Sequence, residues 1–197
     1  MDKKSVSATI LILFLTLFFA VIGICFSTFV FKYTKVIVSS VKVNGSNQIK
    51  IYEDRDCTKQ VVELKLSSMD TGLRPATGEI DSETQIPSTI TNTGTSEGYY
   101  STVYVTASGA FNIVINDIQI KTSHDKIEVS EQRKNIFLAV KDVNNSVKTL
   151  EENGTVLASY SNLNEPQEIT FLIWLGSLAS DVLEGADISF SLDFVAA

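Results

Sequence analysis

An uncharged apolar run near the N-terminus constrains this chain more than any other feature. Residues 5–31 contain no Asp, Glu, Lys or Arg, and Lys4 and Lys32 flank the run. A helix needs about 20 apolar residues to cross the hydrocarbon of a bilayer. The sequence therefore predicts a short tail, a single transmembrane helix that acts as a signal anchor, and one domain, at residues 1–5, 6–31 and 32–197 respectively.

Cleavage and sidedness leave two alternatives open. A cleavable signal peptide has a shorter apolar core of roughly 7–15 residues and small residues at its cleavage site. Here the core is longer, and the bulky Ile24 and Phe26 flank Cys25. Lysines stand on both sides of the run, so the positive-inside rule gives little preference. The richness of the domain in Ser, Thr and Asn favours a place outside the cell membrane, with a cytosolic domain as the alternative.

The part of the chain after the apolar run is acidic. Residues 36–197 carry 12 Lys and Arg against 22 Asp and Glu, a net charge of −10. Such a surface repels nucleic acid and favours basic partners. We expect the membrane as one partner, through the N-terminal helix, and other surface proteins or further copies of the chain as the others.

From residue 36 onward the apolar residues recur with a period of two, which is typical of strands with one buried face. In 188–194, Ile, Phe, Leu and Phe alternate with Ser, Ser and Asp. The other predicted strands lie at 36–43, 48–52, 60–66, 88–92, 99–107, 111–120, 136–143, 155–160 and 169–175. Many short strands at this spacing predict an all-β fold, an antiparallel β-sandwich or jelly roll, after the transmembrane helix.

Two stretches depart from the strand pattern. Residues 67–85 are polar and contain Gly72 and Pro75, which predicts a long exposed loop. Residues 178–184, closed by Gly185, favour one or two helical turns.

Carboxylates are the candidates for metal binding. Glu53, Asp54 and Asp56 lie in one predicted turn, and a second acidic group occurs over 181–187. Either gathers oxygen ligands of the kind that calcium prefers. Neither has the spacing of an EF-hand, and solvated turn charge is the alternative. We therefore predict no metal and no cofactor, with Glu53, Asp54 and Asp56 as weak calcium candidates.

Cys57 is the single cysteine of the domain, because Cys25 lies in the apolar run. A spanning helix and a distant loop cannot meet, so no intrachain disulfide is expected. Cys57 is a candidate for an intermolecular disulfide, with a buried, inert cysteine at a strand end as the alternative. Neighbouring carboxylates disfavour the thiolate and oppose a nucleophilic role.

Residues for catalysis are scarce. His124 is the only histidine, and nucleophilic triads and most zinc sites need imidazole beside further groups. We predict no catalytic residues. Trp174 with Tyr99, Tyr100 and Tyr104 is a candidate to line a carbohydrate or peptide groove, although aromatic residues in strands usually belong to the core.

Several short motifs resemble the TasA and camelysin type of surface protein. They are Ile49-Lys-Ile-Tyr-Glu-Asp-Arg-Asp-Cys-Thr58, Ile90-Thr-Asn-Thr-Gly94, Tyr99-Tyr-Ser-Thr-Val-Tyr-Val105, Ile173-Trp-Leu175 and Gly185 before the last strand. The resemblance implies a secreted or wall-associated jelly roll, and several members build fibres by donating a terminal strand to the next subunit. Members usually have a cleaved signal peptide, and an acidic residue where this chain has Gly176.

These observations favour a non-catalytic, single-pass protein of the cell membrane, whose outer domain serves envelope structure or protein interaction. Assembly through strand edges is the expected mechanism, since an exposed edge is a template for another chain. A ligand-sensing or accessory domain of a membrane complex is the alternative, and it would show a concave apolar pocket. A carboxylate-based hydrolase is the third class.

Overall fold

The computed structural model describes residues 34–44, 49–61, 64, 66, 72–90, 95, 97–123 and 126–197. The chain divides into two compact units, Met1–Lys32 and Tyr33–Ala197, and the described residues belong to the second. The predicted tail and transmembrane helix, 1–5 and 6–31, lie outside them. None of the helices in the described part has the length and apolar character that a membrane crossing needs.

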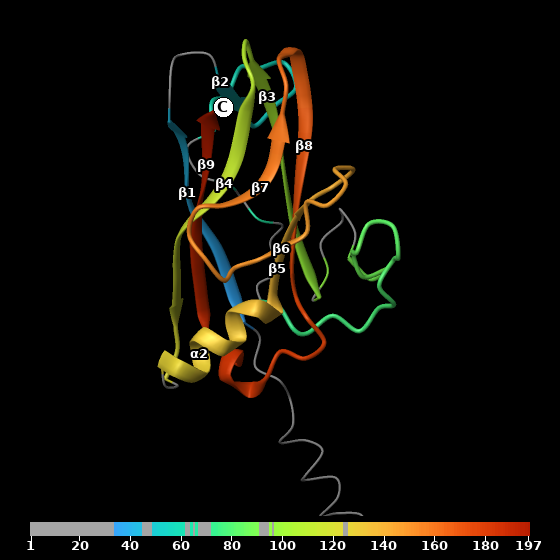
Figure 1. Cartoon of the computed structure of the whole chain (residues 1–197), viewed down its shortest axis with the longest axis vertical. Helices are drawn as coiled ribbons and strands as arrows, with labels where there is room; N and C mark the ends of the chain where they lie inside the picture. Colours follow the sequence, from blue (N-terminus) through green and yellow to red (C-terminus); the bar gives the residue numbers. More distant parts are fainter. Residues whose placement is uncertain are drawn as a thin grey trace, which may run out of the picture. The chain divides into compact units, whose positions relative to one another are not determined.

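Four strands form one sheet, which we name the β9 sheet after a strand at its centre (Figure 1). Its order is β1 (Lys35–Asn44), β9 (Asp187–Ala196), β4 (Phe111–Lys121) and β7 (Thr155–Tyr160). β4 is antiparallel to β9 and to β7, but β1 runs parallel to β9. The prediction of a purely antiparallel sandwich is therefore wrong at this edge. Since β1 leads into the other sheet and is not joined to β9 by a hairpin, its direction is free to be parallel.

Five strands form the second sheet, named the β8 sheet. Its order is β2 (Ile49–Tyr52), β3 (Gly98–Ala107), β8 (Leu163–Leu175), β5 (Ile136–Val140) and β6 (Lys148–Thr149). All of its neighbouring strands are antiparallel. Two sheets built from these strands confirm the predicted all-β, sandwich-like fold.

The core lies between the inner faces of the two sheets. Its largest fully buried side chains are four phenylalanines, Phe111, Phe171, Phe190 and Phe194. The alternation predicted for 188–194 is confirmed, since every apolar residue of that segment has no exposed surface. The polar residues of the same strand are the exception to the prediction, because Ser191 and Asp193 are buried as well.

A second apolar layer covers the outer face of the β8 sheet. Residues of the connection 72–90 pack against outward-facing side chains of β5 and β8, in a cluster of Ala76, Ile90, Ala139, Leu172 and Trp174. The predicted exposed loop is therefore only partly exposed in its described part, because Leu73 and Ala76 are buried while 79–85 are open to solvent. Burial of β8 on both faces explains its continuous apolar run.

Short elements differ most from the predictions. The strand predicted at 88–92 is wrong over 88–90, which form a turn, and at 60–66 the described residues show only an isolated bridge at Gln60. The helix α2 (Lys126–Gln132) with its continuation η1 (Arg133–Asn135) was not predicted. The turn expected near 178–184 is present as η2 (Asp181–Leu183), and Gly185 follows it with a left-handed φ of 68°.

Candidate functional site

The carboxylates proposed for calcium lie in the turn that follows β2. Asp54 accepts hydrogen bonds from the hydroxyl of Thr58 at 2.7 Å and from the backbone N–H of Lys59 at 2.7 Å. The bond from Thr58 lowers the pKa of the Asp54 carboxyl. Its oxygens therefore hold the turn together, and the described residues, Glu53 and Asp56 included, contain no group of three acidic, Cys or His side chains placed to hold a metal.

Cys57 lies in the same turn and is half-buried. Its backbone is left-handed, with a φ of 56°, and its Sγ lies 3.6 Å from the carbonyl oxygen of Arg55. The thiol belongs to a surface turn and not to the core. An intermolecular disulfide at Cys57 stays a prediction, and His124 lies outside the described residues.

The aromatic residues proposed for a groove divide between the two faces of the β8 sheet. Tyr99 is paired with Ile173 on the inner face, whereas Tyr100 packs with Trp174 in the outer layer. Tyr104 donates a hydrogen bond from its hydroxyl to Glu168 at 3.2 Å. The four residues therefore do not form one aromatic groove.

A pocket of about 370 Å³ does lie beside Trp174, between the end of β8 and the connection 72–90. The ring of Trp174 is 2% exposed and stacks on Phe137 with the ring centroids 5.5 Å apart. Lining residues also come from the loop, among them Ile80 and Pro87, and from the turn after β8, including Leu178. The lining of this pocket is mostly apolar.

Gly176 explains how this pocket keeps its shape. A Cβ at position 176 would lie 2.7 Å from Cε2 of Phe137, well inside contact distance. The ring of Phe137 therefore occupies the space that a side chain would need. This is a physical reason for glycine at position 176.

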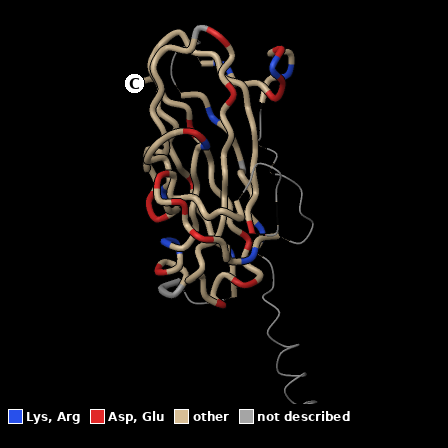
Figure 2. The backbone as a smooth tube through the Cα atoms, turned by 90° about the vertical axis from the view of Figure 1, so that its right-hand side faces the viewer, with Lys and Arg blue, Asp and Glu red and all other residues tan. Residues whose placement is uncertain are grey.

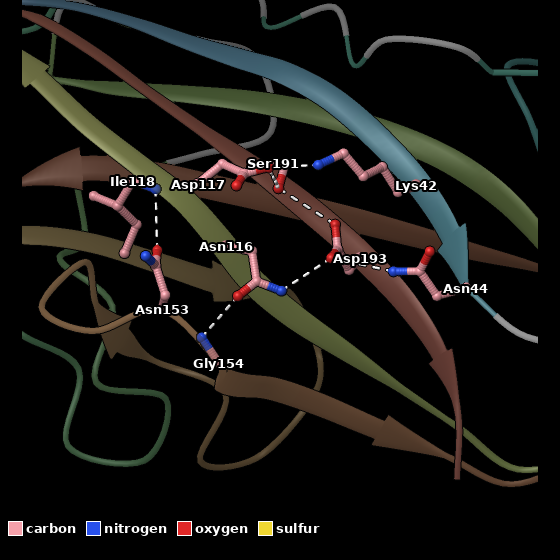
Figure 3. Close-up of polar contacts among 9 residues, drawn as sticks. All are labelled: Lys42, Asn44, Asn116, Asp117, Ile118, Asn153, Gly154, Ser191 and Asp193. Atoms are coloured by element: carbon pink, nitrogen blue, oxygen red, sulfur yellow. Dashed lines mark hydrogen bonds and ion pairs between the residues drawn. The ribbon is translucent and has the colours of Figure 1, made fainter.

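A polar cluster occupies the outer face of the β9 sheet (Figure 3). The carboxylate of Asp193, 6% exposed, accepts hydrogen bonds from the side-chain amides of Asn116 at 2.9 Å and Asn44 at 3.3 Å. The hydroxyl of Ser191 lies 3.3 Å from the other oxygen of Asp193 and 3.1 Å from Asp117. A buried carboxylate is costly unless it is hydrogen-bonded, and here both oxygens have partners. The cluster thus links β1, β9 and β4.

Backbone contacts extend the cluster to the turn before β7. Asn116 accepts a hydrogen bond from the N–H of Gly154 at 2.9 Å, and Asn153 accepts one from the N–H of Ile118 at 3.1 Å. Asp117 has a left-handed φ of 53° at the irregularity between Asn116 and Gln119. The cluster therefore stabilises a bulged part of β4, and sequence reasoning missed it because the polar face of β9 was expected to be open.

An ion pair lies at the exposed margin of the cluster. Nζ of Lys42 is 2.5 Å from Oδ2 of Asp117, and the side chains are 48% and 53% exposed. Its hydrogen bond lowers the pKa of the Asp117 carboxyl and raises the pKa of the Lys42 ammonium. Exposed pairs of this kind are weak and are screened by salt.

We expect Asp193→Ala to lower the free energy of unfolding by about 1–3 kcal/mol, because the hydrogen bonds that Asn44 and Asn116 donate to a buried carboxylate are lost. Asp193→Asn keeps one oxygen for those donors, so it is expected to retain most of the stability. Asp187→Ala, an exposed position on the same strand, is the matched control and is expected to change stability by less than about 0.5 kcal/mol. Urea titration followed by circular dichroism measures all three; equal effects of the two alanine variants would contradict a stabilising role of the cluster.

Asp117→Asn is expected to lower the melting temperature at pH 6 and to have a smaller effect at pH 2. The folded-state pKa of Asp117 is depressed, and the unfolded value is about 3.9. The stability from this carboxylate is therefore present above about pH 4 and is lost as the pH falls through the folded value. Asparagine tolerates the left-handed backbone at this position. Thermal melts at low ionic strength measure the effect, and a difference that stays constant with pH would rule out the ionised carboxylate as its source.

Comparisons of the chain with family models, with curated proteins and with solved structures give no match.

Proposed function

We propose that the chain is a non-catalytic surface protein, anchored in the cell membrane by residues 6–31, whose β-sandwich domain associates with other chains through a sheet edge. The anchor rests on the uncharged run of the sequence, which is long enough to cross a bilayer. The jelly-roll type of fold and the relation to TasA and camelysin are part of the same proposal, and they rest on the short motifs.

The observation that carries the proposal is the open edge of the β9 sheet at β7. Edge strands that avoid pairing carry lysines, prolines or bulges. β1 has two lysines and a register shift between Val38 and Ser40. β7 reads Thr-Val-Leu-Ala-Ser-Tyr, without charge or proline, and its Val156 is 42% exposed. Its pairing with β4 also shifts register, between Ala158 and Val156, so the two edges differ in their lysines and not in the presence of an irregularity. Among the described strands β4 is the one partner of β7, so the far edge offers backbone groups to a second chain.

A lysine on the β7 edge tests this mechanism. We expect the purified full-length chain to self-associate in sedimentation velocity experiments, and Val156→Lys to return it to a monomer. Val43→Lys, at a similarly exposed position of β1, is the matched control and should leave association unchanged. A wild-type chain that stays monomeric at high concentration, together with cells that show no fibres, would remove the support for edge association.

The anchor has a separate test. The N-terminal sequence of the mature protein is expected to begin before residue 6, and protease added to intact cells is expected to digest the domain. A mature N-terminus after residue 31 would indicate a cleaved signal peptide, and a protected domain would indicate a cytosolic one.

A second candidate function is an accessory domain that binds a ligand for a membrane complex. The pocket beside Trp174 favours it, because ligand sites are concave, mostly apolar and about 300–1,000 Å³ in volume.

A further inference from the structure

The two most exposed large apolar side chains in the described part of the unit flank the same pocket. Leu178 is 82% exposed and Ile80 is 65% exposed, and both line the pocket beside Trp174. The remaining exposed apolar residues of this size lie on strands, at 36–42% exposure. Apolar residues around a concave aromatic floor are the arrangement in which protein interfaces bury an anchor side chain.

The pocket is pre-formed by residues with tight neighbours. The rings of Trp174 and Phe137 stack nearly parallel, with an interplanar angle of 9°. On the loop side, Gly78 leaves room for the backbone of Thr89, since a Cβ there would lie 2.7 Å from its nitrogen. A rigid floor lowers the ordering cost of binding, so a partner side chain entering this site gains most of its burial energy as affinity.

The loop side of the entrance is acidic. Glu79, Asp81 and Glu83 surround Ile80 in the sequence, and all three are exposed. Asp81 accepts hydrogen bonds from the backbone N–H of Thr84 at 2.7 Å and from its hydroxyl, and these bonds lower the pKa of the Asp81 carboxyl. On the opposite side, Arg133 and Lys134 precede the lining residue Asn135 in η1. In Figure 2, backbone segments coloured for Asp and Glu also lie in several other turns of the unit.

We propose that this pocket docks a segment of a partner protein that inserts one large apolar side chain and carries Lys or Arg beside it. The apolar side chain fills the space over Trp174 between Ile80 and Leu178. The basic side chains face Glu79 and Glu83, where complementary charge speeds association and selects the partner. This inference names the ligand of the second candidate function, on which it rests, and it does not depend on pairing at β7.

Charge distinguishes this occupant from two others. A second copy of the chain carries a net charge of −7 and lacks the basic segment that would complement the acidic loop at this pocket, although it can still pair elsewhere, at the β7 edge. An anionic lipid surface is repelled by the acidic loop, although exposed Leu and Ile side chains by themselves are compatible with lipid. A partner segment with one large apolar side chain and basic neighbours is complementary to both the apolar floor and the acidic loop.

Fluorescence of Trp174 reports on this site alone, because it is the only tryptophan of the chain. The full-length chain in phosphatidylcholine nanodiscs is titrated with a hexapeptide that has Leu-Phe at its centre and two lysines on each side. The comparison peptide has glutamates in place of the lysines. We expect a saturable change in emission with the basic peptide, and at least tenfold weaker binding of the acidic one.

Variants separate the apolar and the charged parts of the site. We expect binding of the basic peptide to weaken about five- to tenfold in Leu178→Ser. The same loss is expected in the double variant Glu79→Gln/Glu83→Gln, whose binding should also lose most of its salt dependence. Val43→Ser, at an exposed position on β1, should bind as the wild type does. All four sites are exposed, so the fold is not at risk.

Three results would overturn the proposal. They are the absence of a saturable change with the basic peptide, equal binding of the two peptides, and a larger change with phosphatidylglycerol vesicles than with either peptide, which would assign the surface to lipid. The two proposals fail separately. If Val156→Lys loses self-association but still binds the basic peptide, the pocket proposal is supported independently of edge association. If the wild-type chain self-associates but does not bind the basic peptide, edge association is supported and the pocket proposal is overturned.

Discussion

Phe194→Ala is expected to lower the free energy of unfolding by about 3–5 kcal/mol, the cost of emptying a fully buried phenylalanine site. Phe194 has no exposed surface and stacks on Phe111, with the ring centroids 5.9 Å apart. Its strand lies between β1 and β4, and Phe194 is in register with Val43 on one side and Ile113 on the other. The cavity would thus open at the centre of the β9 sheet, where neighbouring strands leave little room to collapse.

Urea unfolding of the full-length chain, followed by far-ultraviolet circular dichroism, measures this loss. Val43→Ala is the control, because Val43 is 39% exposed on the neighbouring strand and its truncation should cost less than about 0.5 kcal/mol. A loss below about 1 kcal/mol for Phe194→Ala would contradict a tightly packed inner core.

Trp174→Ala is expected to cost a similar amount, about 3–5 kcal/mol, but to show a different local signature. Trp174 supports the outer layer on which the connection 72–90 packs. Without the indole, the loop loses its largest partner and opens under conditions in which the sandwich stays folded, as weakly packed segments do. Cleavage after Glu79 or Glu83 by a glutamate-specific protease is therefore expected to be faster than in the wild type.

The two core variants serve as controls for each other in this assay. In Phe194→Ala, cleavage should accelerate only by the amount that the larger globally unfolded population explains. In Trp174→Ala, cleavage should be faster than in Phe194→Ala even if the two variants have the same global stability. Leu178→Ala removes an apolar residue from the same pocket but from an 82% exposed position, so it should leave cleavage unchanged. Unchanged cleavage in Trp174→Ala would show that the loop does not depend on the outer layer.

Half-buried strands were predictable from the sequence because burial of one face makes their apolar residues recur at every second position. Residues 155–160 agree fully with β7, and 36–43, 99–107 and 111–120 agree with β1, β3 and β4 to within one residue at each end. The inner faces of these strands must be apolar whatever the partner strand is, so the pattern survives without knowledge of the fold. Their order in the sheets, and the parallel pairing of β1, depend on contacts between distant segments that no local pattern encodes.

The first half of β8 shows where local patterns mislead. Residues 164–168 are polar apart from Pro166, yet the strand begins at Leu163. Leu163, Gln167 and Glu168 pair with β3, with a register shift at 164–166, while β5 pairs with β8 only from Phe171 onward. A proline is tolerated where its missing N–H faces no partner strand. On the side away from β3, this half of β8 has no partner strand in the described residues and is open to solvent, which explains its polar composition. In the sequence such a polar segment is indistinguishable from a loop.

The candidate sites were predictable only in part. Trp174 was identified as a possible groove residue, but its pocket exists because the connection 72–90 folds back onto β8. The polar cluster around Asp193 was missed because a Ser and an Asp on the polar face of a strand normally indicate solvent. In the fold, Asp193 is buried and accepts hydrogen bonds from Asn44 and Asn116 of the neighbouring strands, which the sequence of β9 alone does not reveal.

The parallel pairing of β1 with β9 has a mechanical consequence. A pull applied between the start of β1 at Lys35 and the C-terminal end of β9 at Ala196 acts along both strands in opposite senses. The hydrogen bonds between the two strands then lie across the direction of the force and share the load, whereas a hairpin pulled at its open end would release them one after another. A tether that continues from residue 34 would therefore meet its firmest resistance at the first strand of the domain.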